Sequence, residues 1–287
     1  RRRVSVAGFE ELLNQSIESA LDLGVLKQEH LKRVNVDTTV QEKAITFPTD
    51  AKLYHRMREK LVKQAKLHGV ELRQTYTRKS KWALIMQSRY RHARQARRAN
   101  AELRKVKTYF GRVLRDLDRK TRGIKRSQKL TELLDLAYRL FRQKKDDKNK
   151  IYSLHAPEVE CIAKGKAHKK YEFGCKVSVV SSSQGNFVLG AMAVHGSPYD
   201  GHTLTKALDQ AKRMTAGNTK TIEEAFVDLG YRGSSHDDIK VHVVKRGLKR
   251  LTPALRRWFK RRAAIEPLIG HIKNDNAGMG SRNYLLG

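Results

Sequence analysis

The spacing of apolar residues changes twice along this chain of 287 residues, from strand alternation to helical spacing and back. In the stretch "VNVDTTV", residues 34–40, valines alternate with polar residues as in a strand. Between residues 51 and 143, apolar residues instead recur every three or four positions, which predicts helices. The spacing is clearest at Leu103, Val106, Phe110, Val113 and Leu117. Because this seam covers only about two heptads, we expect packing within one chain rather than a dimer zipper.

After residue 170 the pattern returns to short strands that alternate with helices. Residues 171–182 and 186–196 flank the turn "SQGN" and predict a β-hairpin. There follow a helix over 201–214, a buried strand within 222–233, a strand over 239–245 and a last long helix over 256–275. The sequence therefore predicts an α/β fold with a helical block inserted after its first strand.

These changes of pattern also predict the domain boundaries along the chain. We expect an N-terminal helical segment at 1–33, with a helix over 8–23, and the first strand of the main domain at 34–50. A basic helical insertion is expected at 51–150, ending in the polar linker "RQKKDDKNK". Residues 151–287 are expected to complete the main domain.

The net charge of +32 indicates the kind of partner. Between Arg78 and Arg126 there are 18 lysines and arginines and three acids. Such a segment repels itself unless a polyanion neutralises it, so the insertion is predicted to contact DNA. We predict contacts from Arg91, Arg94 and Arg98.

Other features exclude a membrane partner and indicate a reducing compartment. No run approaches the roughly eighteen apolar residues of a spanning helix, and a secretory signal is absent. The two cysteines, Cys161 and Cys175, form no Cys-x-x-Cys pair, which is typical of the cytoplasm. The sequence begins at Arg1 and ends in "NYLLG", so we expect both ends to be incomplete.

One carboxylate, Glu266, stands inside the basic segment "RRWFKRRAAIEPLIGHIKND", residues 256–275. Helical spacing places Glu266 on one face with Phe259, Arg262 and Lys273. Pro267 disfavours helical geometry at Glu266, so we expect a kink, or a helix that restarts with Pro267 in its first turn. The alternative explanation is an ordinary surface ion pair between Arg262 and Glu266.

Two aspartates are candidates for the same site. Asp228 follows the apolar "AFV" and precedes Gly230, so it is predicted at the C-terminal end of a strand, where α/β sheets gather ligand sites. Asp37 lies on the polar face of the first strand, where aspartate is disfavoured. A turn-forming role for Asp228 and an exposed edge for Asp37 are the alternatives. Converging with Glu266, these acids can hold two Mg²⁺ ions for phosphoryl transfer.

A further acid, Asp200 in "SPYDGHTL", has two interpretations. It borders this site, or it caps the helix that follows, and capping is the simpler of the two.

These motifs resemble those of DDE transposases of bacterial insertion sequences, in the branch called insertion sequence family five. That family's signature, Tyr-x2-Arg-x3-Glu-x6-Lys, is matched at every spacing, with phenylalanine in place of tyrosine, by Phe259, Arg262, Glu266 and Lys273. Its Asp-x-Gly-Phe/Tyr region is matched by Asp228, Gly230 and Tyr231. Residues 34–53 resemble its first-acid region, and residues 197–204 resemble its stretch before the central helix.

The resemblance implies a ribonuclease-H-like mixed sheet with flanking helices, and an Mg²⁺- or Mn²⁺-dependent enzyme. This enzyme would cleave DNA at insertion-sequence ends and transfer the strand into target DNA. Asp37, Asp228 and Glu266 would be its catalytic metal ligands. Phosphate contacts are implied for Arg262 and Lys273, base stacking for Phe259, and further DNA contacts are expected from Tyr231 and Arg232.

A homodimer on the terminal inverted repeats is also implied, in a prokaryotic cytoplasm and at the nucleoid. Two alternatives stay open: a non-catalytic or decayed DNA-binding protein, and a nuclease or resolvase on the same fold.

Overall fold

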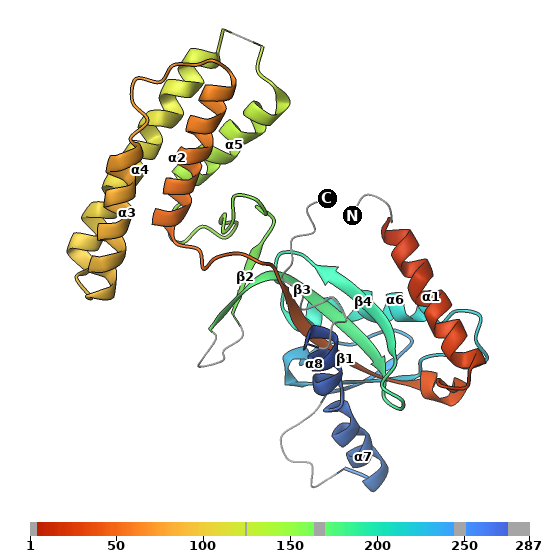
Figure 1. Ribbon diagram of the computed structural model, residues 1–287. Coiled ribbons are helices and arrows are strands. Elements are labelled where there is room, and N and C mark those ends of the chain that lie inside the picture. Colours follow the sequence, from red (N-terminus) through yellow and green to blue (C-terminus); the bar gives the residue numbers. More distant parts are fainter. Residues whose placement is uncertain (1–4, 124, 164–169, 244–250, 275–287) are drawn as a thin grey trace. The chain divides into compact units, whose positions relative to one another are not determined.

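The computed structural model describes residues 5–123, 125–163, 170–243 and 251–274, and it divides into two compact units (Figure 1). The sheet unit comprises Arg1–Ala44 and Cys161–Gly287, and the helical unit comprises Ile45–Glu160. The sequence placed the insertion at 51–150, so the helical unit is somewhat longer at both ends. In the parts of the chain that the structure describes, no helix is long and apolar enough to cross a membrane.

The helical unit contains α2 (Asp50–Leu67), α3 (Thr77–His92), α4 (Ala96–Thr121) and α5 (Gln128–Arg142). The predicted seam of α4 lies in the core of this unit, where Val106, Phe110 and Leu117 are fully buried. This burial confirms the predicted internal packing of the seam. Ser127 starts α5 because its side chain accepts a hydrogen bond from the backbone N–H of Leu130.

The sheet unit is built on a mixed sheet of six strands among the described residues. Its strands are β1 (Arg33–Glu42), β2 (Glu160–Ala163), β3 (Tyr171–Ser182), β4 (Val188–Val194), β5 (Glu224–Val227) and β6 (Lys240–Val243). The order is β2-β3-β1-β5-β6, and β4 pairs with β3. β1 is antiparallel to β3 and parallel to β5, and β5 is parallel to β6. The predicted hairpin and the α/β class are confirmed.

Helices cover both faces of this sheet (Figure 1). On one face, α1 (Val6–Asp22) and α6 (Leu204–Met214) share a core with alternate residues of β1 and β5, such as Val34, Val36 and Ala225. On the other face, Ile265 and Ile269 pack against Val177 and Val179 of β3. Three short 3-10 helices, η1 (Gln28–Lys32), η2 (Asp200–Thr203) and η3 (Leu229–Tyr231), complete the connections in the described part of this unit.

The last long helix predicted over 256–275 is in fact two helices, α7 (Pro253–Arg262) and α8 (Ile265–Asn274). Pro267 is the third residue of α8, where a missing backbone N–H costs nothing because first-turn donors have no partner within the helix. The predicted restart of a helix with Pro267 in its first turn is therefore confirmed, whereas one continuous helical face through Glu266 is wrong.

Candidate active site

Asp37 and Asp228 occupy matching positions on neighbouring parallel strands. The register pairs Val34 with Ala225 and Asn35 with Phe226. Two residues beyond this last pair stand Asp37 on β1 and Asp228 at the end of β5. Because parallel strands run side by side in register, this register places the two aspartates next to each other where β5 ends, a place that we call the acid edge.

Strand alternation also assigns a face to both aspartates. Side chains two residues apart on a strand share a face, so Asp37 lies with Asn35, and Asp228 with Phe226. The side-chain amide of Asn35 donates to the backbone oxygen of Arg261, 3.4 Å away, and Phe226 packs edge-on against Phe259. Asp37 is therefore on the face that α7 and α8 cover, which also carries Glu266, and Asp228 follows directly after the residues of β5 that face α7.

A backbone N–H orients each aspartate locally. Oδ1 of Asp37 accepts the N–H of Thr38 at 2.7 Å, and Oδ1 of Asp228 accepts the N–H of Gly230 at 2.8 Å. Gly230 also needs to lack a side chain, because a Cβ there would lie 2.9 Å from Oδ1 of Asp228 and 3.2 Å from Oδ2 of Asp200. The glycine thus lets two carboxylates approach the same turn.

Arg262 forms ion pairs with both Glu266 and Asp37 and so links Glu266 to the acid edge. Its Nη2 lies 3.1 Å from Oε1 of Glu266, and its Nη1 lies 3.9 Å from Oδ2 of Asp37. The side chain of Arg262 is only 13% exposed, whereas that of Glu266 is 65% exposed. The ion pair between Arg262 and Glu266, which the sequence offered as an ordinary surface pair, is present. The same guanidinium also contacts Asp37, so the ion pair is part of the acid edge.

Asp200 lies beside β1 on the face opposite to Asp37, where it contacts Thr38. Its Oδ1 accepts a 2.8 Å hydrogen bond from the hydroxyl of Thr38 and forms a 2.6 Å ion pair with the ammonium of Lys176. Neither 3-10 helix η2 nor α6 has a side-chain cap hydrogen bond. The predicted capping role of Asp200 is wrong, and the alternative, that it borders the catalytic site, stays a prediction. Lys176 was missed because a lysine within a strand reads as a surface residue.

The phenol of Tyr231 lies near enough to the three aspartates to be affected by their charges. Burial, and then the negative charges of Asp37, Asp200 and Asp228, raise the pKa of its phenol, so the hydroxyl stays protonated. The side chain is fully buried. Tyr231 was predicted as a DNA contact, but in this structure it has no exposed surface with which to touch DNA.

Phe259 is also placed inside the protein. It is 9% exposed and packs edge-on against Phe226 and His242. The predicted base-stacking role therefore has no exposed ring in this structure, and the core explains why phenylalanine fits here without a hydroxyl. Of the other predicted DNA contacts in the sheet unit, Arg232 is exposed and Lys273 is half-buried.

In the helical unit, the predicted arginines gather at the turn that joins α3 to α4. Arg91, Arg94 and Arg98 are all exposed. Arg94 adopts a left-handed backbone conformation with a φ of 58°, which makes the turn tight, and the guanidinium of Arg98 lies 5.8 Å from the centre of the Tyr90 ring. The turn thus presents a small cationic surface.

The carboxylates are not gathered tightly enough to form a complete metal cage. Among the residues that the structure describes, no group of three histidine, cysteine, aspartate or glutamate side chains has the geometry to hold a metal ion. The carboxylate oxygens of Asp37 and Asp228 are ligands of the kind that Mg²⁺ prefers. These two residues fit part of a magnesium site, while Arg262 lies between Asp37 and Glu266.

A mixed sheet with flanking helices, with one acid within β1 and another directly after the neighbouring β5, defines a ribonuclease-H-like fold. A model of the family described as "Transposase DDE domain" matches residues 109–285, more than half of the chain. The chain belongs to this family, as its motifs predict. The matched residues include Asp228 and Glu266, whereas Asp37 precedes them.

Among curated proteins, "Uncharacterized protein ORF8 in nfe locus" of Rhizobium meliloti is 55% identical over 95 residues. That alignment covers 33% of this chain and 46% of the relative, so the chain spans about half the length of the curated protein that it matches. No solved structure matches.

Proposed function

We propose that this chain is a DNA transposase that cleaves the ends of an insertion sequence and joins them to target DNA with the help of a divalent metal. One observation carries the proposal: the register of parallel strands β1 and β5 brings Asp37 and Asp228 to neighbouring positions, and Arg262 contacts both Asp37 and Glu266. In a member of the transposase DDE domain family, this arrangement favours catalysis over DNA binding alone. Acidic side chains contribute nothing to the binding of DNA phosphates.

The donor set suits Mg²⁺ or Mn²⁺. Asp37 and Asp228 would hold the ion, and Glu266 would complete the site. When bound, the ion would activate a water or a 3′-hydroxyl and neutralise charge on the phosphate that is attacked. The backbone N–H groups of Thr38 and Gly230 fix one oxygen of each aspartate and so limit how the carboxylates rotate.

Arg262 has a second role in this proposal. In the structure its guanidinium neutralises Asp37 and Glu266, which would otherwise repel each other. Once a cation neutralises these carboxylates, the fork of N–H donors is placed to bind a phosphate oxygen at the same edge. Lys273, on the following helix, would hold the next part of the DNA backbone.

The DNA partner would be the terminal inverted repeats and then the target duplex, with a homodimer joining two ends. The net charge of +32 and the cationic turn at Arg91, Arg94 and Arg98 support DNA as the partner.

The test is cleavage of a duplex that carries the element end, with Mg²⁺. We expect Asp37→Asn, Asp228→Asn and Glu266→Gln each to abolish nicking while DNA binding is retained. Glu18→Gln, which changes an exposed acid of α1, is the matched control and should cleave normally. Normal cleavage by Glu266→Gln would refute the assignment of the third acid.

The products separate the proposal from its alternatives. A transposase joins the liberated 3′-hydroxyl to target DNA, whereas a nuclease or resolvase on this fold yields no such strand-transfer product. Wild-type protein that binds DNA but never nicks it would indicate a decayed, non-catalytic protein.

A further inference from the structure

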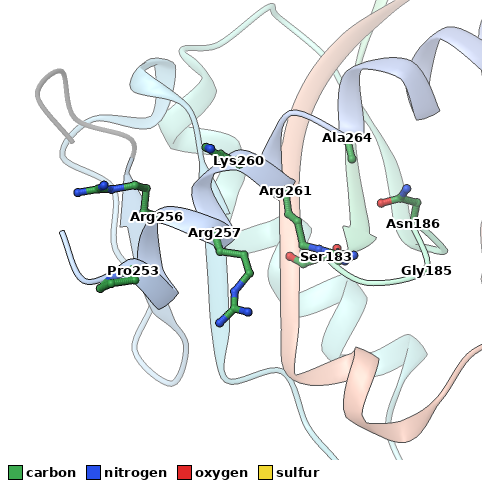
Figure 2. A pocket seen from close by; sticks show the side chains of 9 residues that line it. All are labelled: Ser183, Gly185, Asn186, Pro253, Arg256, Arg257, Lys260, Arg261 and Ala264. Atoms are coloured by element: carbon green, nitrogen blue, oxygen red, sulfur yellow. The ribbon is translucent and has the colours of Figure 1, made fainter. Parts of the chain in front are cut away.

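A cationic groove separate from the acid edge runs along α7 in the sheet unit. It has a volume of about 580 Å³ and is lined by the turn that follows β3, by α7 and by Ala264 after α7 (Figure 2). Four cations line it: Arg256, Arg257, Lys260 and Arg261. None of the lining residues that the structure describes is acidic, so an anion would enter without meeting a like charge.

The helix α7 therefore divides its cations between two surfaces. Arg262 turns toward Asp37 and Glu266, whereas Arg261 donates to the backbone oxygen of Ser183 at 3.3 Å on the groove side. Figure 2 shows the side chain of Arg261 extending from α7 to Ser183, with Gly185 and Asn186 beyond. The groove is thus a surface distinct from the one that holds the acids.

The wall of this groove is fixed to the strand that carries Asp37. The buried side chain of Asn35 accepts the hydroxyl of Ser183 at 2.8 Å and donates to the backbone oxygen of Arg261 at 3.4 Å. Asn35 and Asp37 are two residues apart, a distance of about 7 Å along an extended strand. An anionic chain that lies in the groove would therefore also reach the acid edge.

The lining chemistry favours phosphates. Arginine and lysine are typical phosphate contacts, and no aromatic residue that could stack on an unpaired base is among the described lining residues. The neighbouring ring of Trp258 is already covered by the guanidinium of Arg33, 4.7 Å from the ring centre. From Arg256 to Arg261 the helix rises about 7.5 Å, which matches two successive phosphate steps of about 3.4 Å along the axis of one DNA strand.

We propose that this groove binds the phosphate backbone of duplex DNA without regard to sequence and holds the duplex against the acid edge. The inference rests on the proposed function only in taking DNA as the ligand. It adds a contact site that needs neither a metal nor cleavage.

The experiment measures binding of the full chain to two labelled duplexes of equal length and unrelated sequence, with EDTA, over a series of salt concentrations. The variant is Arg257→Gln with Lys260→Gln, two exposed residues. Arg261 is left intact because it bonds to Ser183. The matched control, Lys206→Gln with Arg213→Gln, removes two exposed cations from α6.

We expect the groove variant to bind both duplexes about tenfold more weakly or worse, and to lower the salt slope by about 1.8, since each phosphate contact contributes about 0.9. The control should keep the wild-type slope. Arg257→Lys with Lys260→Arg keeps both charges and should retain affinity, which separates lost charge from misfolding.

Two results would overturn the proposal: a groove variant whose slope matches that of the control, or a loss confined to one of the two duplexes, which would indicate base recognition. Either result leaves the cleavage test untouched. Conversely, wild-type protein that shows this slope but never cleaves would refute the proposed reaction and not the groove.

Discussion

The ammonium of Lys176 lies 2.6 Å from Oδ1 of Asp200, and the lysine side chain is only 9% exposed. The same ammonium donates to the backbone oxygen of Pro198, and the same carboxylate oxygen accepts the hydroxyl of Thr38. Because Thr38 follows Asp37 on β1, this ion pair on one face of the strand supports the proposed catalytic acid on the other.

Removing Asp200 should therefore affect both stability and activity. Asp200→Ala leaves the buried ammonium without its counter-charge, and we expect the free energy of unfolding to fall by about 1.5–3 kcal/mol. Cleavage should fall as well, because Thr38 loses its partner. In Lys176→Met with Asp200→Ala no charge is left buried, so stability should partly recover while cleavage stays low. Denaturant unfolding and a nicking assay measure the two effects, and an unchanged Asp200→Ala protein would contradict the role given to the pair.

Glu266 should be expendable for stability even though it is proposed to be essential for cleavage. Its ion pair with Arg262 is largely exposed on the glutamate side, and such i,i+4 pairs are worth about 0.3–0.5 kcal/mol. We expect Glu266→Gln to change the free energy of unfolding by less than about 0.5 kcal/mol. A loss of several kcal/mol, measured by denaturant unfolding, would mean that Glu266 holds the fold together, and its loss of activity would then carry no information about catalysis.

Tyr231 distinguishes a core residue from a DNA contact. Its ring is fully buried, so Tyr231→Ala should cost about 3–5 kcal/mol through the cavity it leaves. Tyr231→Phe keeps the ring and should bind DNA like the wild type in an anisotropy titration. Weaker DNA binding by a stably folded Tyr231→Phe protein would restore the role that the sequence predicted.

The helical unit should lose stability in acid through Asp118. Burial alone would raise the pKa of this carboxyl, but hydrogen bonds from Tyr138, Arg122 and Arg126 outweigh it and lower the pKa below 3.8. A lowered folded-state pKa adds stability above the unfolded-state value, and this stability is lost as the pH falls through the folded value.

Circular dichroism of thermal unfolding at a series of pH values checks this prediction. Asp118→Asn should be less stable than wild type at neutral pH, and the difference should shrink below about pH 4. A difference that is constant with pH would show that the charge of Asp118 is not responsible.

The elements that the sequence predicted best are those whose pattern is local. The alternation of Val34 and Val36 with polar residues, the seam of α4, and Pro267 in the first turn of α8 are each decided by neighbours along the chain. The convergence of Asp37 and Asp228 was a hypothesis from their chemistry, strengthened by the resemblance, because strand order in the sheet depends on distant parts of the chain.

Side-chain environments were the part that sequence reasoning missed. Phe259 and Tyr231 belong to matched motifs, yet both are buried, and a motif does not say which side of a residue faces solvent. Lys176 and Asp200 are 24 residues apart and form an ion pair that no local pattern indicates. The groove likewise depends on the turn after β3 lying against α7.

Binding of Mn²⁺, followed by electron paramagnetic resonance, tests most directly whether Asp37 and Asp228 hold a metal together. We predict that Asp37→Asn and Asp228→Asn each weaken Mn²⁺ binding by at least about tenfold, since even residues one step removed from a metal have effects of that size. Glu18→Gln should bind Mn²⁺ as the wild type does. Equal Mn²⁺ affinity in all four proteins would contradict the account.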